Sequence, residues 1–565
     1  MKSSRKFLAI TLVATLLLAL LAPSFAVAVT DDSSWTDHPD FPGQIGLAAY
    51  GEPTTFTIAR DTGLNPVHKP GLDWDNNMWQ EEYKRMNIIL NTAWTAEGYE
   101  AYSEKLNLLI TRNELPDVFQ CNVAQFQLLC ENDLIQPLDE VLEKYATDFF
   151  NESMADPIAQ NALRQATYDG KLMAIPLANA GNGAAHLMFI RQDWLDALGM
   201  VAPTNMEELE ALMYAFTFSD PDGNGIDDTY GLCLGNEVIT TYMSINGILN
   251  GFGAFPDSWV VNEDGKVAYG SVQPEVKTAL EMLTKWYEMG IIDPEFIEKN
   301  NFAASSDMVA GKGGIAFAEW WLATWPLPEA YQQGHEWRAH PIPFDVNSPK
   351  AGVRVSDKLN NFLVVAKTCD DPSIAVKLSN IYQERILGYT SDLFVWKGDG
   401  DYDFTQYTFG GSLMGPDKNL QIMHLATQAI DTGDESILET SEQRQVYGYI
   451  QGYLTGSPTV EENPEAFGTN QLFHNINYGE ETSAYGIMNQ YALKNQLVPD
   501  AFRGSMDLDL EAKKTTILTH TNETFLNIIC GNSGIEEFDT FIEIFNSQGG
   551  LEMTEFAQAW YDAMN

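Results

Sequence analysis

Oxygen-bearing side chains recur at alternate positions of one short loop near the middle of the chain. The run from Asp220 to Asp228 reads DPDGNGIDD, which puts side-chain oxygens at loop positions 1, 3, 5 and 9 and a turn glycine, Gly225, at position 6. An EF-hand-type calcium loop has this spacing and takes a further ligand from the backbone carbonyl at position 7. The spacing predicts a calcium site. The alternative is a solvated turn that binds nothing.

The same loop departs from the calcium pattern at its end. Gly231 stands at position 12, where the pattern has a bidentate acid, and Tyr230–Leu234 has strand character instead of forming a second helix. One or two ligands would therefore come from elsewhere. Because a signalling loop needs helices on both sides that reorient, we expect a bound Ca²⁺ to be structural.

Tryptophans gather directly after a predicted strand at residues 313–317. Aromatic faces suit the apolar C–H faces of sugars, while carboxylates and amides suit their hydroxyl rims. In open α/β sheets a strand end commonly faces a crevice. The alternative is that these tryptophans belong to the core. The predicted ligand-binding residues are Glu319, Trp320, Trp321 and Trp325, with Trp74 from the polar stretch 73–79 as a further candidate.

Signatures of enzymes are absent from the sequence. It contains no HExxH, GxSxG, Walker-type GxxxxGK[ST] or complete GxGxxG motif, and its eight histidines are scattered. We therefore assign no catalytic residue. A glycosidase needs only two carboxylates placed correctly in space, so a secreted carbohydrate-active enzyme, either a hydrolase or a lyase, stays as the alternative function.

Strand-like and helix-like segments alternate along most of the chain. Residues 54–58, 115–119 and 313–317 have strand character, whereas 99–110, 201–218 and 274–289 have helical spacing. In the second of these helices, Thr204 is the expected N-cap and Glu207 closes a capping box. Such alternation predicts an α/β fold with layered sheets and helices.

The N-terminus has the layout of a cleaved secretory signal, predicted at residues 1–28. Three basic residues precede an apolar run from Phe7 to Leu21, followed by Pro23 and an Ala-x-Ala site ending at Ala28. An uncleaved membrane anchor is the alternative. No cysteine ends the apolar run, so we expect no lipid anchor and a periplasmic or extracellular location.

Charge excludes two classes of partner. Removing the three basic residues of the signal leaves 29 basic against 79 acidic residues, a net charge of −50. This surface repels nucleic acid and anionic lipid. Polyanionic ligands are also disfavoured unless basic residues line the binding site. The five cysteines include no CxxC pair, although the spacing of Cys121 and Cys130 would permit a disulfide.

Several segments together resemble the family 1 extracellular solute-binding proteins. Singly each is weak, but they occur in the right order from about Thr54 to Trp560. They are Arg191–Gly199, Pro203-Thr204, Thr229–Leu232, Leu115–Phe119, Tyr168–Pro176, Glu523–Gly531, Phe538-Asp539 and Gly549-Gly550.

The resemblance implies a two-lobed periplasmic-binding-protein-like fold with the ligand in a cleft between the lobes and no reaction performed. Members with a long calcium loop bind oligosaccharides, and the loop of alginate-binding members holds a structural Ca²⁺. Trp194 lies on the family's helix motif and is expected in the core. On this pattern the metal ligands are Asp220, Asp222, Asn224, Ile226 and Asp228.

The expected protein is a monomer that captures an oligosaccharide, neutral in charge, and delivers it to a membrane ABC permease. Its expected organisation is a linker at residues 29–53 followed by two lobes. Lobe 1 comprises residues 54–180 plus about 305–370, and lobe 2 comprises about 181–304 plus 371–565.

Overall fold

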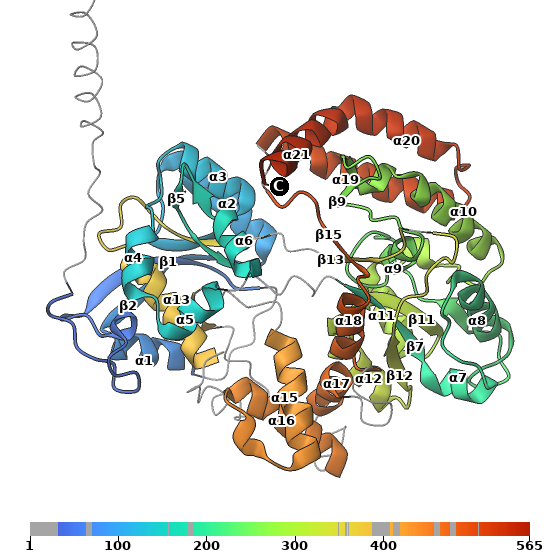
Figure 1. Ribbon diagram of the computed structural model, residues 1–565, viewed down its shortest axis with the longest axis horizontal. Helices are drawn as coiled ribbons and strands as arrows, with labels where there is room; N and C mark the ends of the chain where they lie inside the picture. The colour runs from blue at the N-terminus through green and yellow to red at the C-terminus, as the bar shows by residue number, and fades with distance from the viewer. Residues whose placement is uncertain are drawn as a thin grey trace, which may run out of the picture.

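The computed structural model contains two lobes, each built around its own sheet (Figure 1). Their hydrophobic cores are separate clusters, one drawn from residues 41–175 and 359–409 and the other from residues 185–355 and 422–541. The structure describes residues 32–63, 71–155, 157–177, 185–348, 350–355, 359, 361–386, 407–410, 418–456, 464–474, 482–504, 506 and 508–564. The expected two-lobed α/β fold is confirmed.

The first lobe contains a five-stranded sheet in the order β2-β1-β3-β14-β6. Strands β1, β2 and β3 are parallel, and β14 runs antiparallel between β3 and β6. The carboxyl ends of β1 and β3 therefore meet at one edge of the sheet. The strands are β1 (Thr54–Asp61), β2 (Ile88–Ala96), β3 (Val118–Asn122), β14 (Asn361–Val365) and β6 (Ile175–Leu177).

Helices cover this sheet because the crossovers between parallel strands place them on its faces. A small hairpin, β4 (Thr167–Tyr168) and β5 (Lys171–Leu172), precedes β6. The helices are α1 (Met78–Arg85), α2 (Tyr99–Arg112), α3 (Val123–Glu131), α4 (Asp139–Tyr145), α5 (Asp148–Met154), α6 (Pro157–Gln165) and α13 (Ser373–Ile386).

The second lobe contains a four-stranded sheet in the order β12-β7-β11-β8. Strand β11 lies antiparallel to β7 and parallel to β8. Two short ladders, β9 with β10 and β13 with β15, lie outside this sheet. The strands are β7 (His186–Arg191), β8 (Tyr230–Leu232), β9 (Trp259–Val261), β10 (Val267–Tyr269), β11 (Gly313–Glu319), β12 (Trp337–His340), β13 (Val353–Val355) and β15 (Leu497–Pro499).

Most of the second lobe is helical, and its last helices extend above the sheet (Figure 1). A short 3₁₀ turn, η5 (Trp320–Ala323), follows β11 directly. The helices are α7 (Gln192–Leu198), α8 (Met206–Phe218), α9 (Asn246–Gly251), α10 (Pro274–Glu288), α11 (Asn301–Val309), α12 (Leu327–Gln332), α15 (Lys418–Thr432), α16 (Ser441–Thr455), α17 (Pro464–Phe473), α18 (Ala484–Leu493), α19 (Leu508–Ile529), α20 (Glu537–Phe545) and α21 (Leu551–Met564).

The lobe ranges differ from those expected. Residues 305–340 were placed in the first lobe, yet β11 pairs with β7 and β8 of the second. Conversely, α13 was placed in the second lobe, yet Ile374, Leu378 and Ile381 belong to the core of the first. The sequence pattern of an apolar strand or an amphipathic helix shows that the segment is buried. It does not show which sheet the segment packs against, and this explains both errors.

Residues 32–50, expected as part of a linker, instead form an ordered segment that packs on the first lobe. We call it the N-terminal strap. Its Phe41, Leu47 and Tyr50 are buried in the core of that lobe, and it is closed by a bridge between Thr36 and Ala49. Lys377 of α13 donates to the carbonyl of Ala48 at 2.5 Å. The Asp, Pro and Gly residues that indicated a linker form tight turns here.

The start of α8 lies one residue beyond the expected position. Asn205 is the N-cap and accepts from the amide of Glu208, while the Glu208 carboxylate accepts from the amide of Thr204. The capping residues are therefore Asn205 and Glu208 instead of Thr204 and Glu207. Trp194 is buried, as expected.

All five cysteines are free thiols, so the disulfide that the spacing of Cys121 and Cys130 would permit is not formed. The predicted signal peptide at residues 1–28 lies outside the described residues. Within the described part of the chain, no helix combines the length and the apolar character needed to cross a membrane.

We predict that Arg385→Leu destabilises the first lobe by about 3–5 kcal/mol, because it removes the closest cationic partner of a buried carboxylate and leaves that carboxylate only the longer contact with Arg85, at 3.4 Å. Arg385 bonds Glu82, whose side chain is 1% exposed, at 2.7 Å. Urea denaturation followed by circular dichroism measures the change. The control is Lys84→Ala, which removes an exposed ion pair with Glu81 worth about 0–1 kcal/mol. Equal effects would contradict the assigned role of Arg385.

Candidate functional site: a cavity between the lobes

Polar and aromatic side chains collect where β1 and β3 of the first lobe end. They line a cavity of about 160 Å³ at this edge of the sheet. Such an edge is where ligands bind in open α/β sheets, because the adjoining loops diverge there. The lining includes Arg60, Asp61, Tyr99, Tyr102, Ser103, Gln120, Asn122, Gln125, Asn361, Thr408 and Phe409.

A larger cavity of about 680 Å³ adjoins the first and lies between the lobes. Both cavities share Tyr99, Asn122 and Asn361. Its first-lobe wall comes from the starts of α2 and α3 and from Gln165, and its second-lobe wall includes Trp259 and the start of α19. These elements face each other in Figure 1. The size falls within the range of about 300–1,000 Å³ typical of ligand sites.

The predicted aromatic cluster lies on the second lobe, at the end of β11. Trp321 and Trp325 are stacked with ring centroids 6.2 Å apart, and Phe302, whose side chain is 62% exposed, stacks on Trp325 at 5.8 Å. Tyr242 contacts both tryptophans edge-on. The turn η5 packs against α17 and α18, which lie on the side of the second lobe that faces the first (Figure 1).

Trp320 and Glu319 have more enclosed surroundings. Trp320 packs against the core of the second lobe and lies 5.5 Å from the ring of Tyr485. Glu319 accepts from Nε1 of Trp321 at 3.1 Å. Burial raises the pKa of Glu319 to about 7, although the hydrogen bond from Trp321 opposes the shift. At neutral pH this carboxyl group can therefore both donate and accept hydrogen bonds.

The structure brings Glu319, Trp320, Trp321 and Trp325 together, whereas Trp74 lies in the first lobe against Arg60 and Tyr407. None of these five lines the two cavities. The cavity residues were missed because they are separate polar and aromatic residues at the ends of β1 and β3 and at the starts of β14, α2 and α3. The only sequence signal for them is a polar residue directly after a buried strand, as at Asn122.

The predicted calcium loop follows α8 directly and leads into β8, as expected. The carboxylates of Asp222 and Asp228 approach one point, since each accepts from Nδ2 of Asn224, at 2.8 and 3.3 Å. The Asp220 carboxylate accepts from the amide of Gly225, whose φ is +74°. The turn geometry and the donor types therefore fit a hard cation such as Ca²⁺.

Gly231, at position 12 of the loop pattern, is fixed by packing. A Cβ atom there would lie 2.5 Å from Cβ of Met213. Gly231 is buried in β8 and its amide donates to Thr217 at 3.0 Å. An acid at this position would have to displace α8, which explains the departure from the calcium pattern.

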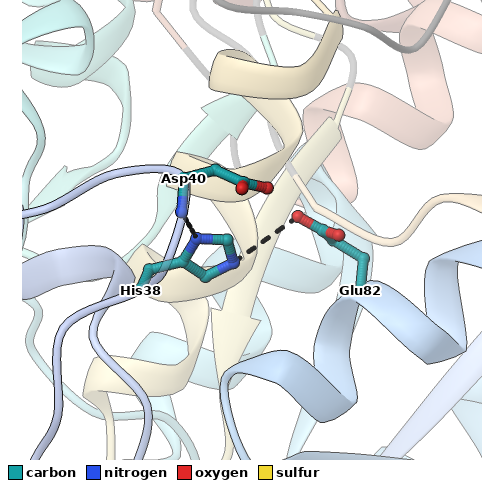
Figure 2. A group of neighbouring side chains, drawn as sticks. All are labelled: His38, Asp40 and Glu82. Carbon is teal, nitrogen blue, oxygen red and sulfur yellow. Dashed lines mark hydrogen bonds and ion pairs between the residues drawn. The ribbon is translucent and has the colours of Figure 1, made fainter.

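A second group of metal-type ligands, His38, Asp40 and Glu82, occurs in the described part of the chain (Figure 2). Nδ1 of His38 accepts from the amide of Asp40 at 3.1 Å, and Nε2 lies 3.6 Å from Glu82. Arg385 bonds both carboxylates, and Arg85 lies 3.1 Å from Asp40. Two guanidinium groups thus already neutralise the carboxylates, and we assign the cluster to anchoring the N-terminal strap on α1 and α13.

Two lobes with a cavity between them define the class of periplasmic-type binding proteins. The model of the bacterial extracellular solute-binding protein family matches residues 81–382. The chain belongs to this family.

Three curated proteins are similar to part of the chain. They are lipoprotein LipO of Bacillus subtilis (28% identical, 40% of this chain and 43% of that protein), the polygalacturonan/rhamnogalacturonan-binding protein YtcQ of Bacillus subtilis (25%, 42% and 45%), and the fructooligosaccharide ABC transporter substrate-binding protein FusA of Streptococcus pneumoniae (26%, 36% and 39%). The chain thus spans less than half the length of the curated relatives it matches.

Solved structures match nearly the whole chain and share its fold. An HMO-binding solute-binding protein of Bifidobacterium longum infantis is 17% identical with a TM-score of 0.59, covering 91% of this chain and 99% of that one. Alginate-binding protein AlgQ2 without calcium ion is 16% identical (0.56, 91% and 99%). The FusA EF-hand mutant of S. pneumoniae with fructo-nystose is 18% identical (0.57, 90% and 99%).

We predict that Glu319 makes the protein less stable as the pH rises. The folded state holds its proton up to about pH 7, whereas the unfolded chain releases it near pH 4.3. Between these values the native state binds more protons, so stability falls by at most about 1.4 kcal/mol per pH unit. Glu319→Gln should remove this loss in melts from pH 4.5 to 8. The exposed Glu329→Gln on α12 is the control. If the stability of the wild-type protein and that of Glu319→Gln change with pH in the same way, the prediction is contradicted.

Proposed function

We propose that the protein captures an oligosaccharide between its lobes and presents it to an ABC permease. The observation that carries this proposal is the cavity of about 680 Å³ lined from both lobes. Its walls combine an exposed aromatic ring, Tyr99, with amides, such as Asn122 and Asn361. Rings stack on sugar C–H faces and amides bond hydroxyl groups, so this lining suits a carbohydrate.

Aromatic residues of the second lobe extend the proposed site. We place Trp320, Trp321, Trp325 and Glu319 on the ligand side because they end β11 and adjoin the helices that face the first lobe. Trp74 is proposed as a first-lobe contact because it lies against Arg60, which lines the smaller cavity. YtcQ and FusA, named for binding saccharides, support this ligand class.

The cellular location and the partners of the protein follow from its family and its charge. Family membership implies an exported protein, and we propose a periplasmic or extracellular monomer. YtcQ, FusA and the structural neighbours are named as binding proteins, and the comparisons do not support the enzyme alternative. The net charge disfavours polyanionic ligands at long range, so neutral chains are the starting expectation. Arg60, a basic residue that lines the smaller cavity, could still bind an acidic group locally.

We also propose that Asp220, Asp222, Asn224, Asp228 and the carbonyl of Ile226 hold a structural Ca²⁺. The approach of Asp222 and Asp228 to one point supports this assignment. The ion would stabilise the loop between α8 and β8 within the second lobe. The structural neighbours include AlgQ2 without calcium ion and an EF-hand mutant of FusA, both of which fit a calcium site in this fold.

Incubation with malto-, fructo-, xylo- and galacturono-oligosaccharides tests the function. The expected result is saturable binding by calorimetry, followed by recovery of the intact ligand on chromatography. Shortened products would support the enzyme alternative instead. Failure to bind any chain would contradict the proposed function.

Replacing Trp320 and Trp321 by Ala, singly and together, should weaken binding by about 1–3 kcal/mol for each lost platform. The fold should survive because both side chains are partly exposed. Titration calorimetry and a melt on the same protein separate the two effects. The matched control is Trp194→Ala, which should cost about 3–5 kcal/mol of stability because Trp194 is buried. Lost stability with unchanged affinity would assign Trp320 and Trp321 to the core.

Removing calcium with EDTA should lower the melting temperature, and adding Ca²⁺ should restore it. A ligand present at 100 times its dissociation constant stabilises the folded state by about 2.7 kcal/mol. The double variant Asp220→Ala, Asp222→Ala should show no response to either reagent. If EDTA does not change the melting temperature of the wild-type protein and no metal is detected after purification, the calcium assignment is disproved.

A further inference from the structure

Four arginines are buried in the described part of the chain, and three of them face a carboxylate. Arg191 pairs with Asp193, Arg338 with Glu336, and Arg385 with Asp40 and Glu82. The fourth, Arg60 of β1, is 4% exposed and has no carboxylate at ion-pair distance among the described residues. Since a buried charge is stable only when it is paired, Arg60 differs from the other three.

The surroundings of Arg60 satisfy one end of its guanidinium group only. Nη1 donates to the carbonyl of Thr408 at 2.9 Å. The group lies over the rings of Trp74, at 5.2 Å, and Phe409, at 5.6 Å. Nε and Nη2 are both buried, and neither has a hydrogen-bond partner in the described part of the chain. These two atoms form one edge of the planar group, and that edge is unsatisfied.

A carboxylate is the group that this edge binds best. In the same chain, Nε and Nη2 of Arg191 bond the two oxygens of Asp193 at 2.8 and 2.6 Å. A bidentate pair of this kind satisfies both donors and neutralises the charge. A sugar hydroxyl can accept a hydrogen bond from the same edge, but it leaves the positive charge unpaired.

Two acidic side chains lie near Arg60 without bonding it. Asp61 also lines the smaller cavity, and its Oδ1 accepts from the amides of Gly63 and Gly98 at 2.8 and 3.0 Å. Asp75 accepts from the hydroxyl of Thr92 at 2.9 Å and attracts Arg60 only at longer range. The missing counter-charge therefore has to come from outside the described residues. Because Arg60 lines the smaller cavity, a bound ligand can supply it.

We propose that the Nε–Nη2 edge of Arg60 binds a carboxylate of the transported oligosaccharide, which makes the ligand a uronate-containing chain. This inference rests on the proposed function. The net charge of the protein does not oppose a single contact of this kind, because charges more than about 8 Å away are largely screened at physiological salt.

The test compares an acidic chain with its uncharged copy. Calorimetry is run with trigalacturonic acid, a glucuronic-acid-substituted xylo-oligosaccharide and the methyl ester of each, and with neutral maltotriose. The wild-type protein should bind at least one acid roughly 10- to 100-fold more tightly than its ester, as expected for a charge-assisted bidentate pair.

Variants of Arg60 should reduce this preference. Arg60→Gln, which loses the charge, should bring the ratio of acid to ester affinity close to one, and Arg60→Lys, which keeps the charge but not the paired edge, should lower it to an intermediate value. The ratio is measured within one preparation, so partial loss of folded protein does not change it, and Arg60→Lys serves if Arg60→Gln fails to fold. The control is Arg112→Gln, an exposed residue of α2 that lines neither cavity, and it should keep the wild-type ratio.

Four results would overturn the inference. Equal affinity of the wild-type protein for acid and ester would remove the role of charge. Variants that lower the melting temperature but keep the ratio would assign Arg60 to packing against Trp74 and Phe409. Tight binding of maltotriose alone would contradict the inference but leave the proposed function intact, whereas binding of none of the chains would contradict both.

Discussion

The two lobes share no hydrophobic core cluster in the described part of the chain. The chain crosses from one lobe to the other between β6 and β7, between β13 and β14, and between residues 410 and 418. Because each core is complete in itself, the lobes are joined by connections and by limited contact instead of a shared interior. This constraint leaves the facing edges of the two lobes free to carry polar and aromatic side chains. It also permits hinge closure, the movement by which two-domain binding proteins enclose their ligands.

Both lobes use strand ends to build the facing surfaces. In the first lobe, β1 and β3 end at Asp61 and Asn122, and the residues around them line the cavities. In the second lobe, β11 ends at Glu319 and is followed at once by the aromatic turn. The strands fix these positions through their hydrogen-bonded registers, so the site residues stand on rigid elements although they come from distant parts of the sequence.

Part of this arrangement could be predicted from the sequence. Local patterns indicated β1, α2 and α10 closely, because alternation and helical spacing are properties of single segments. The calcium-type loop and the cluster at Glu319–Trp325 were also found as continuous motifs. The allocation of β11 and α13 to the lobes was wrong, because strand pairing and helix docking depend on contacts between segments far apart in the chain.

The residues that line the cavities were even harder to predict from the sequence, because their roles also depend on contacts between distant segments. Arg60 lies in an ordinary strand pattern, and nothing in its sequence neighbours reveals that no described carboxylate lies at ion-pair distance from it. That property appears only when Thr408, Phe409 and Trp74 are placed around it. The N-terminal strap is another case, because Phe41 and Tyr50 have no helix or strand pattern of their own and are buried only through contact with the first lobe.

Small-angle X-ray scattering with and without a saturating oligosaccharide tests the central claim, that the ligand is enclosed between two lobes. Binding is first established by calorimetry on the same sample. The account predicts a smaller radius of gyration in the bound state, because contacts made from both lobes favour the closed form. An unchanged radius of gyration at full saturation would contradict it.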